Sequence, residues 1–468
     1  MRSDEVPLGE VVDRLPVPFA GEGEGEAGLT FGQLGLWQTM ANNVSRTIAH
    51  VAEADPGTTV ADVADMLGFM VGRHESLRTT LVLREDGGLP RQRVTSAGET
   101  PLVVVSPGTA DPAEVAEALS MHWQVALYDL ENELPVRMAA IVAGGEVTHV
   151  VTVILHTSID AFGLLALVAD IGARDRATGA AAGPVTALTP LAQAAREASP
   201  AGRRQNERSL RYLEQVLRVA PTTLFGPPRY DVARHIEVLR YRSHALGMAI
   251  RAVAARESMG DSPAMLAAFV AAVARVTGRT GVPVLVMVSN RFRPGYADSV
   301  SSLIKISPFL LDVADLTLGE AVVRTGGQSL SVYKNAYYDA YDQDEVVARV
   351  EEERGERFDL SCYYNDHRLG DRARAGDAAP SEADIRAALA DSELTWLSNV
   401  GVPGAKLTLS VDDLDGPVDL TLSGDLRYFS RDDLAGLART IEEVAVQTAI
   451  EPGTPAAHAR PVPAGVAR

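Results

Sequence analysis

The sequence predicts an α/β protein built from two sandwich lobes, in each of which long helices pack on a sheet. The chain has 468 residues, which suggests roughly two to three domains, and 46% of them are hydrophobic, enough to form large cores. Amphipathic helical segments and short strand-like runs alternate in similar proportion in both halves. A poorly periodic Gly/Pro-rich stretch at 177–190 lies between the halves and is predicted to connect them.

The first half begins with a helical pattern and ends with a hairpin and a helix. Leu34, Trp37 and Met40 have the spacing of one helix face. Gly144 and Gly145 separate two apolar runs, which is typical of a β-hairpin turn. The predicted elements of this half, in order, are a helix at 31–43, a helix turning into a strand at 61–83, strands at 91–95 and 101–106, a helix at 111–130, strands at 135–144 and 146–155, and a helix from Phe162 onward.

The second half mixes the same two kinds of segment. Long apolar helical patterns indicate buried helices, and short apolar runs bounded by turn residues indicate strands. The predicted elements, in order, are a helix at 207–219, a strand at 235–243, a helix at 262–278, a strand at 282–290, a helix at 316–338, a strand at 357–366, two or three strands within 407–429, and a helix at 432–449.

These patterns divide the chain into five parts. We expect a flexible N-terminal lead at 1–28, or a short strand within it, because this stretch is acidic and rich in Gly and Glu. An N-terminal lobe follows at 29–178, a linker at 179–206 and a C-terminal lobe at 207–450. The Pro/Ala-rich residues 451–468 are expected to form a disordered tail.

Charge and composition exclude several classes of function. The formal net charge of −19 argues against a nucleic-acid or anionic-membrane partner, because both require a basic face. The single cysteine, Cys362, rules out an internal disulfide and a cysteine-based zinc cluster, and we expect no metal. No secretory signal and no apolar run of about 18 residues is present, so we expect a cytoplasmic protein that binds no membrane.

The stretch VTVILHTSIDAFGLLALVADI at 151–171 places polar chemistry between two apolar elements. His156 follows the predicted strand, and Asp160 precedes the predicted helix. An imidazole titrates near neutral pH and can transfer protons, and a carboxylate can orient or anchor a neighbouring group. Taken alone, His156 is more often a core histidine at a strand end than a catalytic residue.

Several motifs together resemble the condensation domains of nonribosomal peptide synthetases and their acyltransferase relatives. LHTSIDA at 155–161 is similar to the family signature HHxxxDG, with Leu155 in place of the first histidine and Ala161 in place of the glycine. Four other segments are similar to family elements and occur in the family's order: LTFGQLGLWQ at 29–38, RHESLRTTL at 73–81, YDLENELPVRM at 128–138 and SNRFRPGYADSVSSLIKISPFLLDV at 289–313. The resemblance covers 27–450 and favours a catalytic His156.

The resemblance implies two chloramphenicol-acetyltransferase-like lobes that form a V-shaped pseudo-dimer with a central tunnel. The signature histidine is expected midway along this tunnel. Donor acyl groups are expected to arrive from one side as thioesters on a phosphopantetheine arm, and the acceptor from the other side.

The resemblance also implies roles for individual residues. His156 is the expected general base, or a residue that positions the acceptor. Asp160 is expected to pair with a buried arginine of the second lobe, matched here by Arg291 in the SNR segment, and to fix the loop that holds the histidine. Ala161, Gly163, Tyr364 and Trp396 are expected to line the tunnel, although core packing is an equal alternative for the last two.

The predicted function is that of a free-standing condensation enzyme. It joins a carrier-bound acyl or aminoacyl thioester to an amine or alcohol, forming an amide or ester in natural-product biosynthesis. We expect a monomer without a bound cofactor, because the substrate is carried on the phosphopantetheine of a separate carrier protein.

Two alternatives remain open. Leu155 and Ala161 depart from the signature, as expected for a catalytically inactive module that binds or recruits a carrier or a tailoring enzyme. The other alternative is an acyltransferase that uses acyl-coenzyme A.

Overall fold

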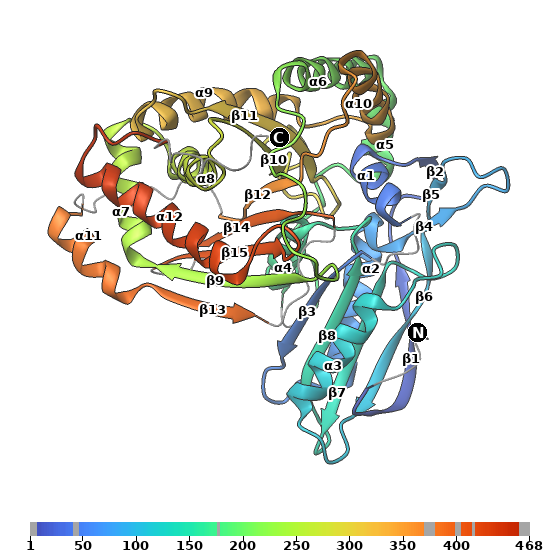
Figure 1. The fold of residues 1–468 in the computed structure, drawn as a ribbon. Helices are drawn as coiled ribbons and strands as arrows, with labels where there is room; N and C mark the ends of the chain where they lie inside the picture. Colours follow the sequence, from blue (N-terminus) through green and yellow to red (C-terminus); the bar gives the residue numbers. More distant parts are fainter. Residues whose placement is uncertain are drawn as a thin grey trace. The chain divides into compact units, whose positions relative to one another are not determined.

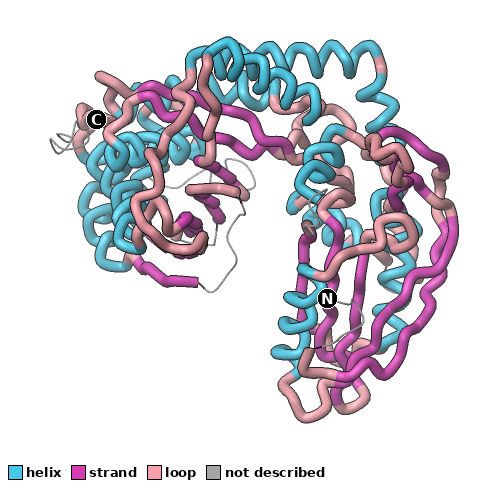
Figure 2. Tube along the Cα trace, turned by 45° about the vertical axis from the view of Figure 1, so that its right-hand side comes forward, coloured by secondary structure: helices cyan, strands magenta, loops and turns pink. Residues whose placement is uncertain are grey.

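A computed structural model describes residues 7–40, 46–175, 178–368, 380–397, 404–413 and 417–457. The chain forms two compact units. Unit 1 consists of Met1–Glu207, Ser289–Lys305 and Tyr337–Tyr341, and unit 2 consists of Arg208–Val288, Ile306–Ala336 and Asp342–Arg468. Both units combine helices with sheets (Figures 1 and 2). Helix α6 (Pro200–Val219) runs across the boundary at Glu207.

Unit 1 contains a large sheet and a small one. The large sheet has the order β1-β6-β7-β8-β3, formed by β1 (Glu10–Ala20), β6 (Ala97–Ser106), β7 (Val136–Ala143), β8 (Glu146–Leu155) and β3 (Thr47–Glu53). The small sheet has the order β2-β5-β4, formed by β2 (Gly25–Gly28), β5 (Arg91–Val94) and β4 (Thr79–Val82). The helices are α1 (Phe31–Met40), α2 (Val60–Arg73), a short 3₁₀ turn (Glu75–Arg78), α3 (Pro112–Val125), α4 (Ala161–Gly172) and α5 (Pro190–Ala198).

Helices cover both faces of the large sheet because both sets of alternating side chains are apolar. Val151 and Val153 of β8 share one core cluster with α3. Ile154 belongs to a second cluster with residues of α2 and α4. A central strand buried on both faces reads as a continuous apolar run, as β8 does. The predicted hairpin between β7 and β8 is confirmed, with Gly144 and Gly145 at φ 62° and 88°.

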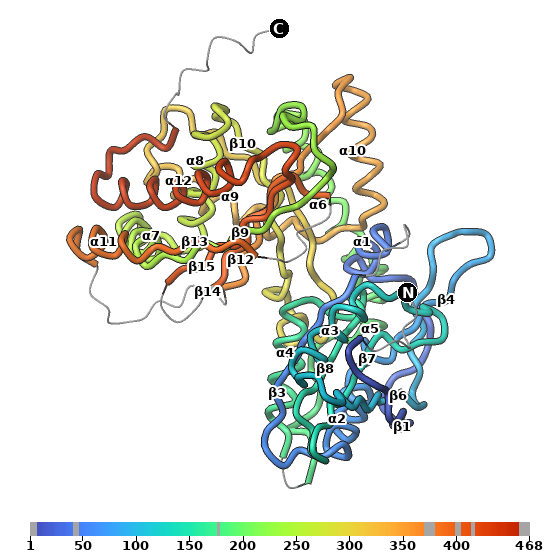
Figure 3. Tube along the Cα trace, turned by 60° about the horizontal axis from the view of Figure 1, so that its bottom comes forward, coloured from blue at the N-terminus to red at the C-terminus, as the bar shows by residue number. Residues whose placement is uncertain are grey.

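Unit 2 is built on one seven-stranded sheet of order β11-β10-β12-β14-β15-β9-β13. Its strands are β9 (Ile236–Ser243), β10 (Gly281–Val288), β11 (Lys305–Asp312), β12 (Cys362–Asp366), β13 (Glu393–Leu397), β14 (Leu407–Asp413) and β15 (Val418–Asp425). Its helices are α7 (His244–Arg256), α8 (Asp261–Thr277), α9 (Leu318–Asn335), α10 (Ala340–Arg354), α11 (Glu382–Ala388), a short 3₁₀ turn (Leu389–Asp391) and α12 (Arg431–Ile450). Side chains of α7, α8, α9 and α12 share one core with the strands. Figure 3 shows β13 beside β9 after α11.

Three predicted boundaries need correction. The N-terminal lead is not flexible throughout, because β1 pairs with β6 from Glu10 to Ala20 and buries Val17 and Phe19. The apolar alternation of this strand was hidden by its acidic, Gly-rich surroundings. The predicted linker at 179–206 contains α5 and the start of α6. The part of the expected tail at 451–457 is ordered, with Ala456 buried, while 458–468 lies outside the described residues.

The assignment of 289–305 also differs from the sequence prediction. The proposed C-terminal lobe at 207–450 includes this stretch, but its contacts group Ser289–Lys305 with unit 1. A loop between two strands of one sheet carries no periodic pattern that indicates which core it joins. Within the described ranges, no single helix is long and apolar enough to cross a membrane.

The order of the N-terminal strand is testable by substitution of Phe19. This side chain is 7% exposed in the core beneath the large sheet, so Phe19→Ala is expected to lower the free energy of unfolding by about 3–5 kcal/mol. The matched control is Val12→Ala, since Val12 lies on the same strand and is 55% exposed. Chemical denaturation measures both. If Phe19→Ala and Val12→Ala both lowered the free energy of unfolding by the same small amount, the N-terminal lead would be flexible as first predicted.

Candidate active site

His156 and Asp160 lie where β8 meets α4. The strand ends at Leu155, and the backbone N–H of His156 donates to the carbonyl oxygen of Arg46 at 2.8 Å. A turn follows, in which the N–H of Ser158 donates to the Leu155 carbonyl oxygen at 2.9 Å. Asp160 then caps α4, its Oδ1 accepting from the N–H of Gly163 at 2.7 Å. The sequence folds this way because Asp satisfies a first-turn amide that has no helical partner.

The imidazole of His156 is held in a partly buried setting that favours its neutral form. Burial lowers the pKa of His156, since it removes water from the charged ring. The backbone of His156 and Ile159 and the Asp160 carboxylate oppose this shift, while the guanidinium of Arg46 adds to it. Nδ1 is fully buried and has no hydrogen-bond partner among the described residues.

The carboxylate of Asp160 is almost completely buried and is anchored on both oxygens. Oδ1 accepts from Arg291 Nη2 at 2.6 Å, and Oδ2 accepts from the N–H of Leu303 at 2.8 Å. The side chains of Asp160 and Arg291 are 1% and 10% exposed. A buried ion pair is costly unless further hydrogen bonds satisfy its partners. The donors to Asp160 satisfy the carboxylate, whereas Nε of Arg291 is buried and has no hydrogen-bond partner among the described residues.

Arg291 binds the loop that carries it as well as Asp160. Nη1 donates to the carbonyl oxygen of Ser299 at 2.6 Å, and Nη2 donates to that of Ser301 at 3.1 Å. The preceding Asn290 has φ 59° and donates from Nδ2 to the Leu303 carbonyl oxygen at 3.0 Å. The two charged residues therefore meet as predicted, but Arg291 belongs to unit 1 by its contacts.

The predicted tunnel residues are placed differently from one another. Gly163 is buried, and a Cβ there would meet Ser301 O at 3.0 Å and Arg291 Nη2 at 3.1 Å. The absence of a side chain therefore allows the loop at 289–305 to pack closely against α4. Ala161 is exposed at the start of α4.

Tyr364 and Trp396 lie in unit 2. Tyr364 is 3% exposed, stacks on Phe269 with ring centroids 5.9 Å apart, and donates to Asp366. It is thus a core residue of its sheet. Trp396 lies half-buried on the edge strand β13, with the Arg431 guanidinium 4.8 Å from its ring centroid.

Sequence reasoning missed a buried acidic network in unit 1. Glu197, placed in the predicted linker, accepts from the N–H of Phe31 at 2.8 Å and from the hydroxyl of Tyr337. Tyr337 contacts Tyr296 through their hydroxyls at 3.2 Å. Burial raises the pKa of Glu197 to about 7, against these hydrogen bonds and the nearby Lys305. Nothing in the local sequence around α5 indicated a buried carboxylate.

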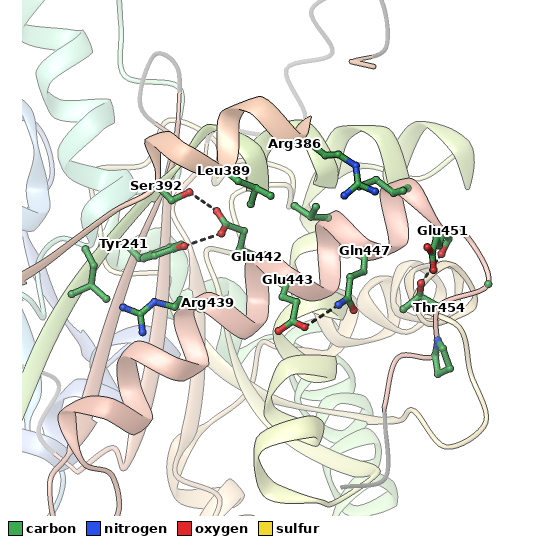
Figure 4. Close-up of a pocket in the computed structure, with 15 residues that line it drawn as sticks. Tyr241, Arg386, Leu389, Ser392, Arg439, Glu442, Glu443, Gln447, Glu451 and Thr454 are labelled. Atoms are coloured by element: carbon green, nitrogen blue, oxygen red, sulfur yellow. Dashed lines mark hydrogen bonds between the residues drawn. The ribbon is translucent and has the colours of Figure 1, made fainter. Parts of the chain in front are cut away.

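A cavity of about 970 Å³ lies in unit 2 between α11, β13, α12 and the segment around Thr454 (Figure 4). Glu442 points into a set of hydroxyls there and accepts from Tyr241 at 2.9 Å and Ser392 at 2.6 Å. None of the predicted site residues lines this cavity. In the described part of the chain, no group of three or more His, Cys, Asp or Glu side chains is arranged to hold a metal ion.

Comparison with known proteins assigns the family. A sequence model of the condensation domain matches residues 24–387, so the chain belongs to the condensation-domain family. Condensation domains form amide bonds by acyl transfer in nonribosomal peptide biosynthesis.

Two curated relatives are nonribosomal peptide synthetases by name. "Probable non-canonical nonribosomal peptide synthetase (NRPS) CymA" of Salinispora arenicola is 29% identical over 273 residues, or 54% of this chain. Phosphinothricin tripeptide synthetase PhsC of Streptomyces viridochromogenes is 29% identical over 319 residues, or 62% of this chain. The matches span only 3% and 29% of the lengths of these two relatives.

Solved structures share the fold. The first condensation domain of the calcium-dependent antibiotic synthetase, in complex with a substrate analogue, superposes with a TM-score of 0.67 at 17% identity, covering 92% of this chain and 98% of that one. The X-domain from teicoplanin biosynthesis gives a TM-score of 0.70 at 17% identity, covering 94% and 98%. The predicted α/β fold with chloramphenicol-acetyltransferase-like lobes is thereby confirmed.

The ion pair beneath His156 is testable by a double-mutant cycle. Asp160→Ala leaves the Arg291 guanidinium buried without its partner and removes the cap of α4, so we expect a loss of about 3–5 kcal/mol in the free energy of unfolding. Arg291→Ala is expected to be similarly costly, and the double variant less costly than the sum. Asp86→Ala, which breaks an exposed pair with Arg84, serves as the control. Additive losses would mean that the two charges do not interact.

The Glu197 network predicts a pH-dependent stability. The native carboxyl keeps its proton up to about pH 7, whereas the unfolded one releases it near its ordinary value of 4.5. The native state therefore binds more protons between these values, and the free energy of unfolding falls by up to about 3 kcal/mol as pH rises through this window. Glu197→Gln is expected to remove this component of the slope. Glu117→Gln, an exposed carboxyl on α3, should leave the profile as in the wild type.

Proposed function

We propose that this protein joins an acyl or aminoacyl group, carried as a thioester on the phosphopantetheine of a carrier protein, to an amine or alcohol acceptor. The observation that carries the proposal is the neutral, partly buried His156 in the family's signature position, with Asp160 and Arg291 fixing the turn around it. The proposed donor and acceptor classes are supported by membership of the condensation-domain family.

The chemistry proposed for His156 is that of a general base acting through Nε2. The acceptor nitrogen or oxygen attacks the thioester carbonyl and forms the new C–N or C–O bond, while Nε2 takes its proton. When the C–S bond breaks, the protonated imidazole returns the proton to the leaving pantetheine sulfur. Atoms and charges balance without a cofactor or metal. The positive charge of Arg46 disfavours the imidazolium and so favours the neutral ring that can accept a proton.

Tunnel access forms a second part of the proposal. Ala161 is exposed at the first turn of α4, where the family has a glycine, and is proposed to border the path of the donor arm. Trp396 is proposed to meet the acceptor, since its edge strand leaves it half-buried. Tyr364 is not carried forward, because its ring packs in the core of unit 2.

A non-catalytic role is the competing candidate, favoured by one observation. Leu155 stands where the signature has its first histidine and is 4% exposed, packed in the core rather than at a site. In this case the chain binds a carrier protein or a tailoring enzyme without turnover.

The test measures acyl transfer from a loaded carrier protein to a panel of amines and alcohols, with product detected by mass. His156→Ala is expected to lower the rate by about 10²–10⁴-fold. His149→Ala, on the same strand, is the matched control and should retain the rate. Because the pKa of His156 is lowered, the rate should rise with pH through a midpoint below the ordinary histidine value of about 6.5.

Three outcomes would contradict the proposal. Product formation unaffected by His156→Ala removes the base role. Transfer from acyl-coenzyme A in preference to the loaded carrier points to the acyl-coenzyme A alternative. Tight carrier binding without any product, across the whole acceptor panel, supports the non-catalytic module.

A further inference from the structure

Unit 1 contains an apolar pocket that the proposed reaction does not use. Its volume is about 380 Å³, and it lies between α2, α4 and the strands β3, β7 and β8. Pockets of this size with mainly apolar walls are typical of small-molecule sites. None of His156, Asp160 and Arg291 lines it.

The walls are apolar and adaptable. They include methionines from two elements and branched side chains of α4, namely Met66, Met70, Met138, Leu164, Val168 and Ile171. Methionine side chains are unbranched and flexible, so they can adjust to an elongated apolar ligand. Val168 is 50% exposed and lies at the mouth, which connects the pocket to solvent.

The rim of the pocket is acidic. Glu53, Asp55 and Asp62 are exposed there, and hydrogen bonds from Thr59 lower the pKa of Asp62, so that it stays ionised. The lining residues, all of them in the described part of the chain, include no arginine or lysine. The positive end of α2 supplies only about half a charge, less than the three carboxylates. His50 also lies on the rim and adds a positive charge only when protonated.

We propose that this pocket is a binding site for a single-chain amphiphile with a cationic head, of the alkylammonium class. The chain fills the methionine-lined interior, and the ammonium group meets the carboxylates of Glu53, Asp55 and Asp62. An alkyl carboxylate of the same length is repelled by the same rim.

The site is separate from the candidate active site on the same strand. Thr152 lines the pocket four residues before His156, which is about 13 Å along β8. Ile154 lies between them and is 1% exposed, so its side chain closes the sheet face there. Ligand binding in the pocket can therefore be measured without an assay of acyl transfer.

The experiment is calorimetric titration of the full chain with octylammonium, decylammonium and decanoate below their micellar concentrations. Decylammonium is expected to bind at one site per chain, with affinity rising roughly fourfold for each added CH₂. Decanoate should bind more weakly. Glu53→Gln combined with Asp55→Asn should narrow the difference between the two heads by about two- to fivefold. Glu117→Gln is the charge control.

The second part of the experiment uses variants in which a larger side chain fills or blocks the pocket. Thr152→Phe places an aromatic ring on a strand position that points into the cavity, and Val168→Phe blocks the mouth from a half-exposed position that tolerates change. Either variant, if it folds with the wild-type melting temperature, should abolish decylammonium binding. The proposal is overturned if no saturable binding occurs, if decanoate binds as tightly as decylammonium, or if both folded variants bind as the wild type does.

Discussion

The carboxylate of Asp160 is the group on which the candidate site depends. One side chain caps α4, accepts from the guanidinium of Arg291 and accepts from the backbone of Leu303. These contacts join a helix start to a loop more than a hundred residues away in the sequence, and the turn carrying His156 lies between the strand and that helix start. The hydrogen bonds satisfy the buried carboxylate, so the pair fixes geometry even where it adds little net stability.

The chemistry of His156 follows from that fixed turn. A ring held partly out of water loses the solvation of its charged form, which lowers its pKa and leaves a neutral imidazole at working pH. The carboxylate of Asp160 accepts hydrogen bonds from Arg291, Gly163 and Leu303. Its negative charge raises the pKa of His156, but burial lowers that pKa by more. Orientation and protonation state are thus set by different physical causes at one junction.

The sequence predicted the strand–turn–helix at 151–171, the hairpin before it and the pairing of Asp160 with Arg291. The first two depend on local apolar periodicity, whereas the pairing was implied by the resemblance to condensation domains. The sequence left open a flexible lead or a short strand where β1 lies, because acidic and glycine residues mask the alternation of this strand. It did not predict the membership of 289–305 in unit 1. The buried Glu197 was also missed, since burial of a polar side chain on an amphipathic helix depends on distant segments, here Phe31 and Tyr337.

An NMR titration of the His156 imidazole in the intact chain, assigned by comparison with His156→Ala, measures the protonation state of the ring and the position of its hydrogen. We expect a ring that is neutral at pH 7, protonates only below the ordinary range of histidine, and carries its hydrogen on Nδ1. A ring that is charged at pH 7, or one with the hydrogen on Nε2, would contradict this expectation.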